Sequence, residues 1–218
     1  SSKTLTIRHL DGISIQHLGY DPEVVSEKNK HFRSLPLIEK YVIENPEDLL
    51  FQFYLGRELL NVGRSDEAIL YLERSASGNA PGGTSEHAAV LLVRAFRERD
   101  TQKAKEYCLT FLRRWPNNGD LWYHLGVMCS GEGLWLDASA CFEKALLSFQ
   151  RPWSDLDRTQ GEGLRPWNTL ELLGLAYSML KDVDRAQEIL KEAVRIRPKN
   201  LPPPSSVLEL VKLHRSFS

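Results

Sequence analysis

An all-α fold of repeated helix–turn–helix units is predicted by the spacing of small and apolar residues in this 218-residue sequence. Gly56, Gly126 and Gly174 are each followed twelve residues later by an alanine, and a large apolar residue comes four positions after each alanine. Two of the units close with a proline, at Pro116 and Pro198. This spacing places apolar residues on one face of each of two successive helices, which is the pattern of a repeat solenoid.

The composition narrows the class of protein. The chain has 28 Lys and Arg against 29 Asp and Glu, a net charge of −1, and 42% hydrophobic residues. These values predict a folded core, and a near-neutral chain is not expected to bind nucleic acid by neutralising phosphates. No apolar run approaches the roughly 20 residues of a membrane span. The three cysteines, Cys108, Cys129 and Cys141, form no CxxC pair and fall on apolar helix faces, so we expect buried, reduced thiols and a cytoplasmic location.

Four repeat units, preceded by a degenerate first helix, are expected within a solenoid over residues 22–200. Their anchor positions, Gly56, Leu92, Gly126 and Gly174, lie 36, 34 and 48 residues apart. The last gap exceeds a regular repeat by about 14 residues, which predicts an insertion near residues 150–166. A small residue at an anchor marks a place where two helices approach closely.

The flanks of the repeats differ from them. Glu23 to Glu44 reads as the degenerate helix, and Pro36 inside it is expected to kink it or divide it in two. Residues 201–218 begin with Leu-Pro-Pro-Pro, an extended break, and continue as an amphipathic segment that we expect to form a C-terminal capping helix.

Residues 1–21 are expected to be an extended remnant. Polar and apolar residues alternate over 4–7 and 13–17, and Asp11-Gly12 between them is a turn signal. A hairpin this short needs a sheet to join. Because the chain also starts at Ser1 without an initiator methionine, we expect it to be part of a longer protein whose missing portion supplies that sheet.

The repeat pattern resembles the tetratricopeptide repeat, and this resemblance implies that the helix pairs stack into a right-handed superhelix. The resemblance implies a concave groove lined by the first helix of each unit, and a protein or peptide partner or self-association as its use. The chaperone-binding members hold a terminal carboxylate in a Lys/Asn/Arg clamp, but the matching positions here carry Phe53 and Arg57, so that clamp is absent. Arg57 and Arg97 could contact a ligand or merely solvate a helix face, and both interpretations stay open. The expected groove residues are Phe53, Arg57, Asn61, Phe96, Arg97, Tyr123, Val127, Glu171 and Met179.

The segment before the repeats resembles a second pattern. His17-Leu18-Gly19-Tyr20 is similar to the H-x-G-Y motif with which bacterial family 2 glycosyltransferases leave their catalytic domain and enter C-terminal repeats. This resemblance implies a parent enzyme that transfers a sugar from a nucleotide sugar, with its divalent metal and catalytic base upstream of Ser1. In that parent His17 could ligate the metal, whereas in this chain we expect no cofactor, no metal site and no catalytic residue.

Two Asp-x-Asp sequences, at 155–157 and 182–184, resemble the metal motif of such enzymes but are interpreted as chance, the second as a helix cap. Trp153 and Trp167 bracket the insertion, and we expect them to tuck it against the solenoid rather than form a contact surface.

Two functions remain: an interaction scaffold attached to a glycosyltransferase, or a free-standing repeat adaptor with no enzymatic activity.

Overall fold

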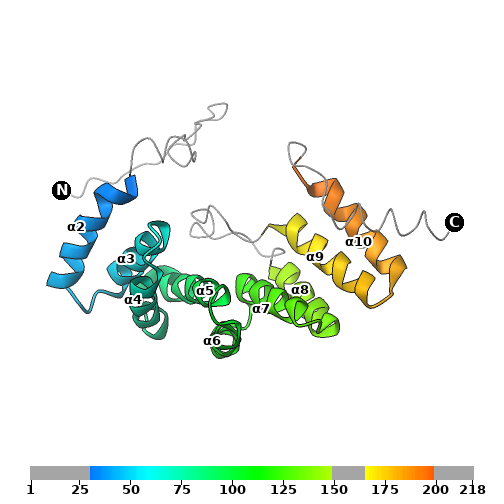
Figure 1. Ribbon diagram of the computed structural model, residues 1–218, viewed down its shortest axis with the longest axis horizontal. Coiled ribbons are helices and arrows are strands. Elements are labelled where there is room, and N and C mark those ends of the chain that lie inside the picture. Colours follow the sequence, from blue (N-terminus) through cyan, green and yellow to red (C-terminus); the bar gives the residue numbers. More distant parts are fainter. Residues whose placement is uncertain (1–29, 149–164, 199–218) are drawn as a thin grey trace, which may run out of the picture.

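The computed structural model describes residues 30–148 and 165–198, and within these ranges the chain is α-helical with one short 3₁₀ turn. The helices follow one another along an arch that begins at α2 and ends at α10 (Figure 1). The predicted all-α repeat fold is confirmed. The helices are α2 (Lys30–Glu44), α3 (Leu49–Asn61), α4 (Ser65–Ser77), α5 (Thr84–Arg97), α6 (Thr101–Arg114), α7 (Gly119–Gly131), α8 (Trp135–Ser148), α9 (Pro166–Met179) and α10 (Val183–Ile196), with the 3₁₀ turn η2 at Pro81–Gly83.

The four predicted units are the helix pairs α3–α4, α5–α6, α7–α8 and α9–α10. In three of them the anchor glycine packs directly against the large residue of the second helix. A Cβ placed on Gly126 would lie 2.7 Å from the Phe142 ring, and one on Gly174 would lie 2.6 Å from Leu190. In the second unit the sizes are exchanged, because the fully buried Leu92 stands at the glycine position and the fully buried Cys108 at the position of Phe142.

Short polar side chains start the helices. The backbone N–H groups of Leu50 and Phe51 donate to the carboxylate of Asp48, and the N–H of Leu121 donates to the side-chain oxygen of Asn118 at 2.7 Å. These bonds satisfy donors that a helix N-terminus otherwise leaves unpaired. Asp182 caps α10 in the same way, so the interpretation of the 182–184 sequence as a helix cap is confirmed.

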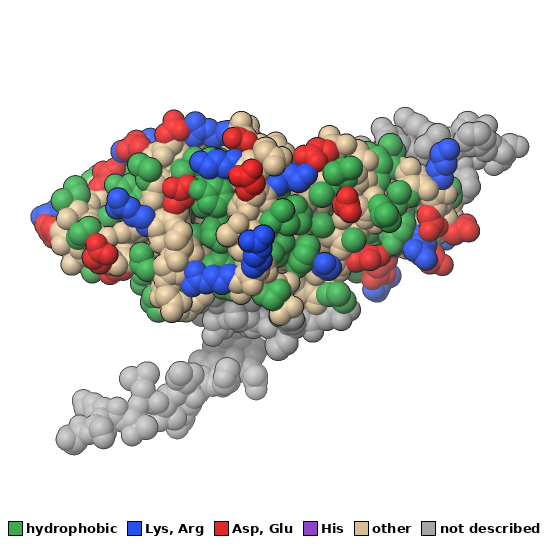
Figure 2. Space-filling model, turned by 90° about the horizontal axis from the view of Figure 1, so that it is seen from below, with side chains coloured by type: hydrophobic (Ala, Val, Ile, Leu, Met, Phe, Trp, Pro, Cys, Tyr) green, Lys and Arg blue, Asp and Glu red, His purple; other side chains and the backbone are tan. Residues whose placement is uncertain are grey.

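Contacts between units divide the helices into two layers. The first helices touch one another in succession, α3 with α5, α5 with α7 and α7 with α9, while α4, α6 and α8 each pack against the first helix of the next unit. Among the described helices, second helices of neighbouring units make no comparable contact with one another, so the first helices form the inner layer of the curved stack. The face seen from below in Figure 1 carries apolar side chains interspersed with both signs of charge (Figure 2).

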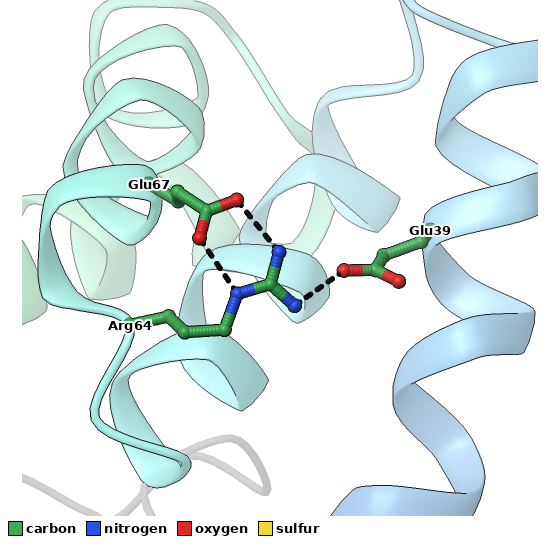
Figure 3. Close-up of polar contacts among 3 residues, drawn as sticks. All are labelled: Glu39, Arg64 and Glu67. Atoms are coloured by element: carbon green, nitrogen blue, oxygen red, sulfur yellow. Dashed lines mark hydrogen bonds and ion pairs between the residues drawn. The ribbon is translucent and has the colours of Figure 1, made fainter.

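Helix α2 extends the stack at its N-terminal end. It runs through Pro36 as a single helix, so the expectation that Pro36 divides it is wrong. Pro36 is exposed, and the loss of one backbone hydrogen bond, at a cost of about 3 kcal/mol, is offset by the packing of the rest of the helix on α3. Arg64 connects α2 to the first unit, because its guanidinium contacts Glu39 at 2.7 Å and is held by both oxygens of Glu67 (Figure 3).

Three predictions lie outside the described residues: the extended remnant with His17, the insertion with Trp153 and the 155–157 sequence, and the C-terminal capping helix.

Candidate protein-binding surface

The inner layer of first helices carries the predicted groove residues, but the structure places them at different depths. Phe53 and Phe96 were expected to line the groove. Each is only 8% exposed, so their side chains are buried instead. The ring of Phe96 stacks on Tyr107 of α6 at 5.2 Å, and the ring of Phe53 lies 6.4 Å from His87 of the next unit. Both are core residues that join helices. Of the others, Arg57, Arg97, Tyr123, Val127 and Glu171 are half-buried, and Asn61 and Met179 are exposed.

Arg57 at the N-terminal end of this surface is neutralised within its own helix. Its guanidinium lies 3.2 Å from the buried carboxylate of Glu58 and over the ring of Tyr54 at 5.1 Å. An arginine that already has a carboxylate and an aromatic face gains little from a further anion.

The centre of the surface is a polar cluster contributed by three first helices. Arg97 of α5 lies with Nη1 3.1 Å from Nδ1 of His124 on α7, and Tyr123 beside it accepts a hydrogen bond from the amide of Asn168 on α9 at 3.1 Å. A guanidinium is a donor only, so Nδ1 of His124 is the acceptor and the ring proton sits on Nε2. Burial, then the charges of Arg97 and Arg94, lower the pKa of His124 to about 3, and the imidazole is neutral at physiological pH.

The pKa of Tyr123 is raised by burial, while the positive charge of Arg97 and the hydrogen bond from Asn168 oppose that rise. Its hydroxyl is therefore protonated at neutral pH and remains a donor as well as an acceptor. The cluster can thus supply hydrogen-bond donors and positive charge to an acceptor outside it.

The C-terminal end of the surface is closed by a half-buried ion pair. Arg197 follows α10, pairs with Glu171 of α9, and lies over the ring of Trp167 at 4.4 Å. Trp167 is the second residue of α9 and is half-buried, whereas the insertion that it was expected to hold against the solenoid lies outside the described residues. Glu171 is consequently held by an internal cation and offers little free charge to a ligand.

The described residues contain no group of His, Cys, Asp or Glu arranged to hold a metal ion. Cys108, Cys129 and Cys141 are buried and unpaired, as predicted. Burial raises the pKa of the Cys108 and Cys141 thiols to about 12, which makes them poor nucleophiles. Within the described ranges no helix has the length and apolar character that crossing a membrane requires.

Comparison with known proteins agrees with this geometry. The family model described as Tetratricopeptide repeat matches residues 168–200, which include most of α9 and all of α10. The crystal structure of the APC/C hetero-tetramer Cut9–Hcn1 superposes with a TM-score of 0.66 at 20% identity, covering 88% of this chain and 35% of that one. YrrB, titled a TPR protein with an unusual peptide-binding site, superposes with a TM-score of 0.57 at 16% identity, covering 87% and 88%. The described helices form a tetratricopeptide-repeat solenoid.

Comparison of sequences finds similarity to a protein named as a glycosyltransferase. The SPbeta prophage-derived glycosyltransferase SunS of Bacillus subtilis strain 168 is 29% identical over 100 residues, which are 44% of this chain and 24% of that protein. The match therefore spans about a quarter of the length of the curated relative.

Sequence reasoning missed two members of the central cluster, His124 and Asn168. Both could have been found from the repeat register: His124 stands two positions and Asn168 six positions before the anchor glycine of its unit, on the same side of the first helix as the expected groove residues.

Proposed function

We propose that this chain is the protein-binding region of a family 2 glycosyltransferase and that it recruits a protein or peptide acceptor to a catalytic domain preceding Ser1. The observation that carries the proposal is the 100-residue similarity to a protein named as a glycosyltransferase. The His17-Leu18-Gly19-Tyr20 sequence directly before the repeats supports it independently.

In this proposal the two parts of the protein divide the reaction. The upstream domain binds the nucleotide sugar and a divalent metal, which His17 could help to ligate, and it carries the catalytic base. The repeats hold the acceptor on their inner layer and raise its concentration near the sugar donor. The polypeptide acts in the cytoplasm, where nucleotide sugars and reduced thiols coexist.

The inner layer suits such a role because its curved surface alternates half-buried apolar and polar side chains. Val127 and Leu175 provide apolar contacts on the third and fourth units, and Arg97 and Tyr123 provide polar contacts on the second and third units. An extended segment laid along this surface can place alternate side chains against both kinds of group.

The second candidate is a free-standing adaptor. It is favoured by the fold itself, because solenoids of this architecture occur in proteins such as Cut9 within an assembly and YrrB with a peptide-binding site. Both candidates use the inner layer for a partner, and they differ only in whether an enzyme is attached.

A transfer assay tests the proposal. The natural full-length polypeptide and residues 1–218 alone are incubated with radiolabelled nucleotide sugars, Mn²⁺ and a lysate of the source cells. We expect label on a protein acceptor with the full polypeptide and none with residues 1–218. The Arg97→Ala substitution in the full polypeptide is expected to reduce acceptor labelling while hydrolysis of the nucleotide sugar continues. No labelling or hydrolysis by the full polypeptide would support the adaptor instead.

A further inference from the structure

Arg97 differs from the other arginines that contact the inner layer. Arg57 pairs with Glu58 and Arg197 pairs with Glu171. Arg97 has the neutral His124 as its side-chain partner, and within residues 30–148 and 165–198 no carboxylate lies at ion-pair distance from it.

The Arg97–His124 pair keeps a positive charge. His124 is neutral, so the pair carries the whole charge of the guanidinium. Half-burial strengthens the field of that charge compared with a fully solvated arginine.

The donors of this cluster are fixed in place before any ligand arrives. One N–H of Arg97 is used on Nδ1 of His124, and this bond orients the guanidinium and leaves its other N–H groups available. Tyr123 lies edge-on to His124 with ring centroids 5.5 Å apart, and its hydroxyl accepts from Asn168, so its own proton is free to be donated. Preorganised donors around an unbalanced positive charge form a site for an anion.

We propose that Arg97 and Tyr123 bind a carboxylate of the partner, namely an aspartate or glutamate side chain of a segment lying along the inner layer, with His124 as the residue that positions Arg97. This inference rests on the proposed protein-binding role and adds the chemistry of the partner to it. The site lies in the middle of the stack, between the first unit on one side and α9 on the other. A bound segment would continue past the site in both directions, so the carboxylate comes from a side chain rather than from the end of a chain.

The site is tested by NMR titration of the full 218-residue chain with three capped probes. The probes are Ac-Gly-Glu-Gly-NH₂, its Gln counterpart, and Ac-Gly-Gly with a free C-terminal carboxylate. We expect the Glu peptide to shift the side-chain Nε–H signal of Arg97 and the backbone signals around Tyr123, with saturation at roughly 1–10 mM, the range of a weak single-contact interaction. The Gln peptide is expected to cause no saturable shift there, and the free-carboxylate peptide to bind more weakly than the Glu peptide.

Variants separate a built site from general attraction. Arg97→Gln keeps a donor for His124 and is expected to weaken Glu-peptide binding about tenfold or more, and Tyr123→Phe about threefold to tenfold, as for the loss of a charged and a neutral hydrogen bond. Arg97→Lys keeps the charge and is expected to retain part of the affinity. This variant replaces Arg97→Gln in the comparison if the latter fails to fold. Arg57→Gln removes the same charge one unit away and is the matched control, expected to leave binding unchanged.

Equal weakening by Arg57→Gln, equal binding of the Gln peptide, or binding of the free-carboxylate probe alone would overturn the proposal. Because these titrations need no upstream domain, they can succeed even if the chain proves to be an adaptor, and they can fail while glycosyl transfer is demonstrated.

Discussion

Close packing of the paired helices at the anchor glycines predicts a large difference between two glycine substitutions in the same helix. Gly126 and Gly131 both belong to α7. A Cβ at Gly126 would lie 2.7, 2.8 and 3.0 Å from atoms of the Phe142 ring, which is fully buried, whereas a Cβ at Gly131 would meet nothing within 4 Å. Gly126→Ala should therefore disrupt the third unit, and Gly131→Ala should leave it intact.

The magnitude follows from two opposed effects. Alanine in place of glycine favours the helix by up to about 1 kcal/mol. Forcing a methyl group into a packed core costs typically about 1–3 kcal/mol, and a rigid ring with no exposed edge places Gly126 toward the upper end. We expect Gly126→Ala to lower the free energy of unfolding by about 1–2 kcal/mol, and Gly131→Ala to change it by between zero and a gain of about 1 kcal/mol.

Urea unfolding followed by circular dichroism measures the difference. Because repeat arrays do not always unfold in one step, the two variants are compared by midpoint together with hydrogen exchange of the α7 and α8 amides. Equal midpoints and equal protection for Gly126→Ala and Gly131→Ala would refute the close-packing argument.

Three further predictions concern packing, pH and reactivity. Gly126→Leu should prevent the third unit from packing, and adding Phe142→Cys, which copies the exchanged sizes of the second unit, should restore about 1–3 kcal/mol in a double-mutant cycle; no coupling would contradict the exchange of sizes. The hydrogen bonds from Arg64 lower the pKa of Glu67 below its usual 4.5. The stability that Glu67 gives over Glu67→Gln should therefore be constant at neutral pH and disappear as the carboxylate becomes protonated in acid. A difference in thermal midpoint that persists unchanged into strong acid would argue against this pairing. Burial of Cys108, whose thiol pKa is about 12, predicts that it reacts with DTNB at pH 8 only as fast as the solenoid opens, and rapid labelling of the folded chain would show that the thiol is accessible.

The sequence predicted the repeat architecture well because its spacing is set by helix geometry alone. The two helices of the fourth unit touch at Gly174 and at the alanine twelve residues later, and the second helix ends just before Pro198. It predicted the surface less well, because burial depends on the neighbouring unit. Phe53 has the same position in its unit as Tyr123, but the former is covered by the ring of His87 and the latter remains half open.

Pro36 shows a second limit of sequence reasoning. A proline inside a helix removes one hydrogen bond, and whether the helix then divides depends on how much packing its two halves share with other elements. The acceptor role of His124 likewise arises only when α5 and α7 lie side by side, since Arg97 is 27 residues away in the chain.

The central claim, that these repeats serve a glycosyltransferase, is tested most directly by reading the coding sequence upstream of Ser1. The account predicts an open reading frame of about 200 residues or more, enough for a separate catalytic domain, with an Asp-x-Asp sequence at the end of a predicted strand. A start codon immediately before Ser1 would contradict the claim and leave a free-standing repeat adaptor.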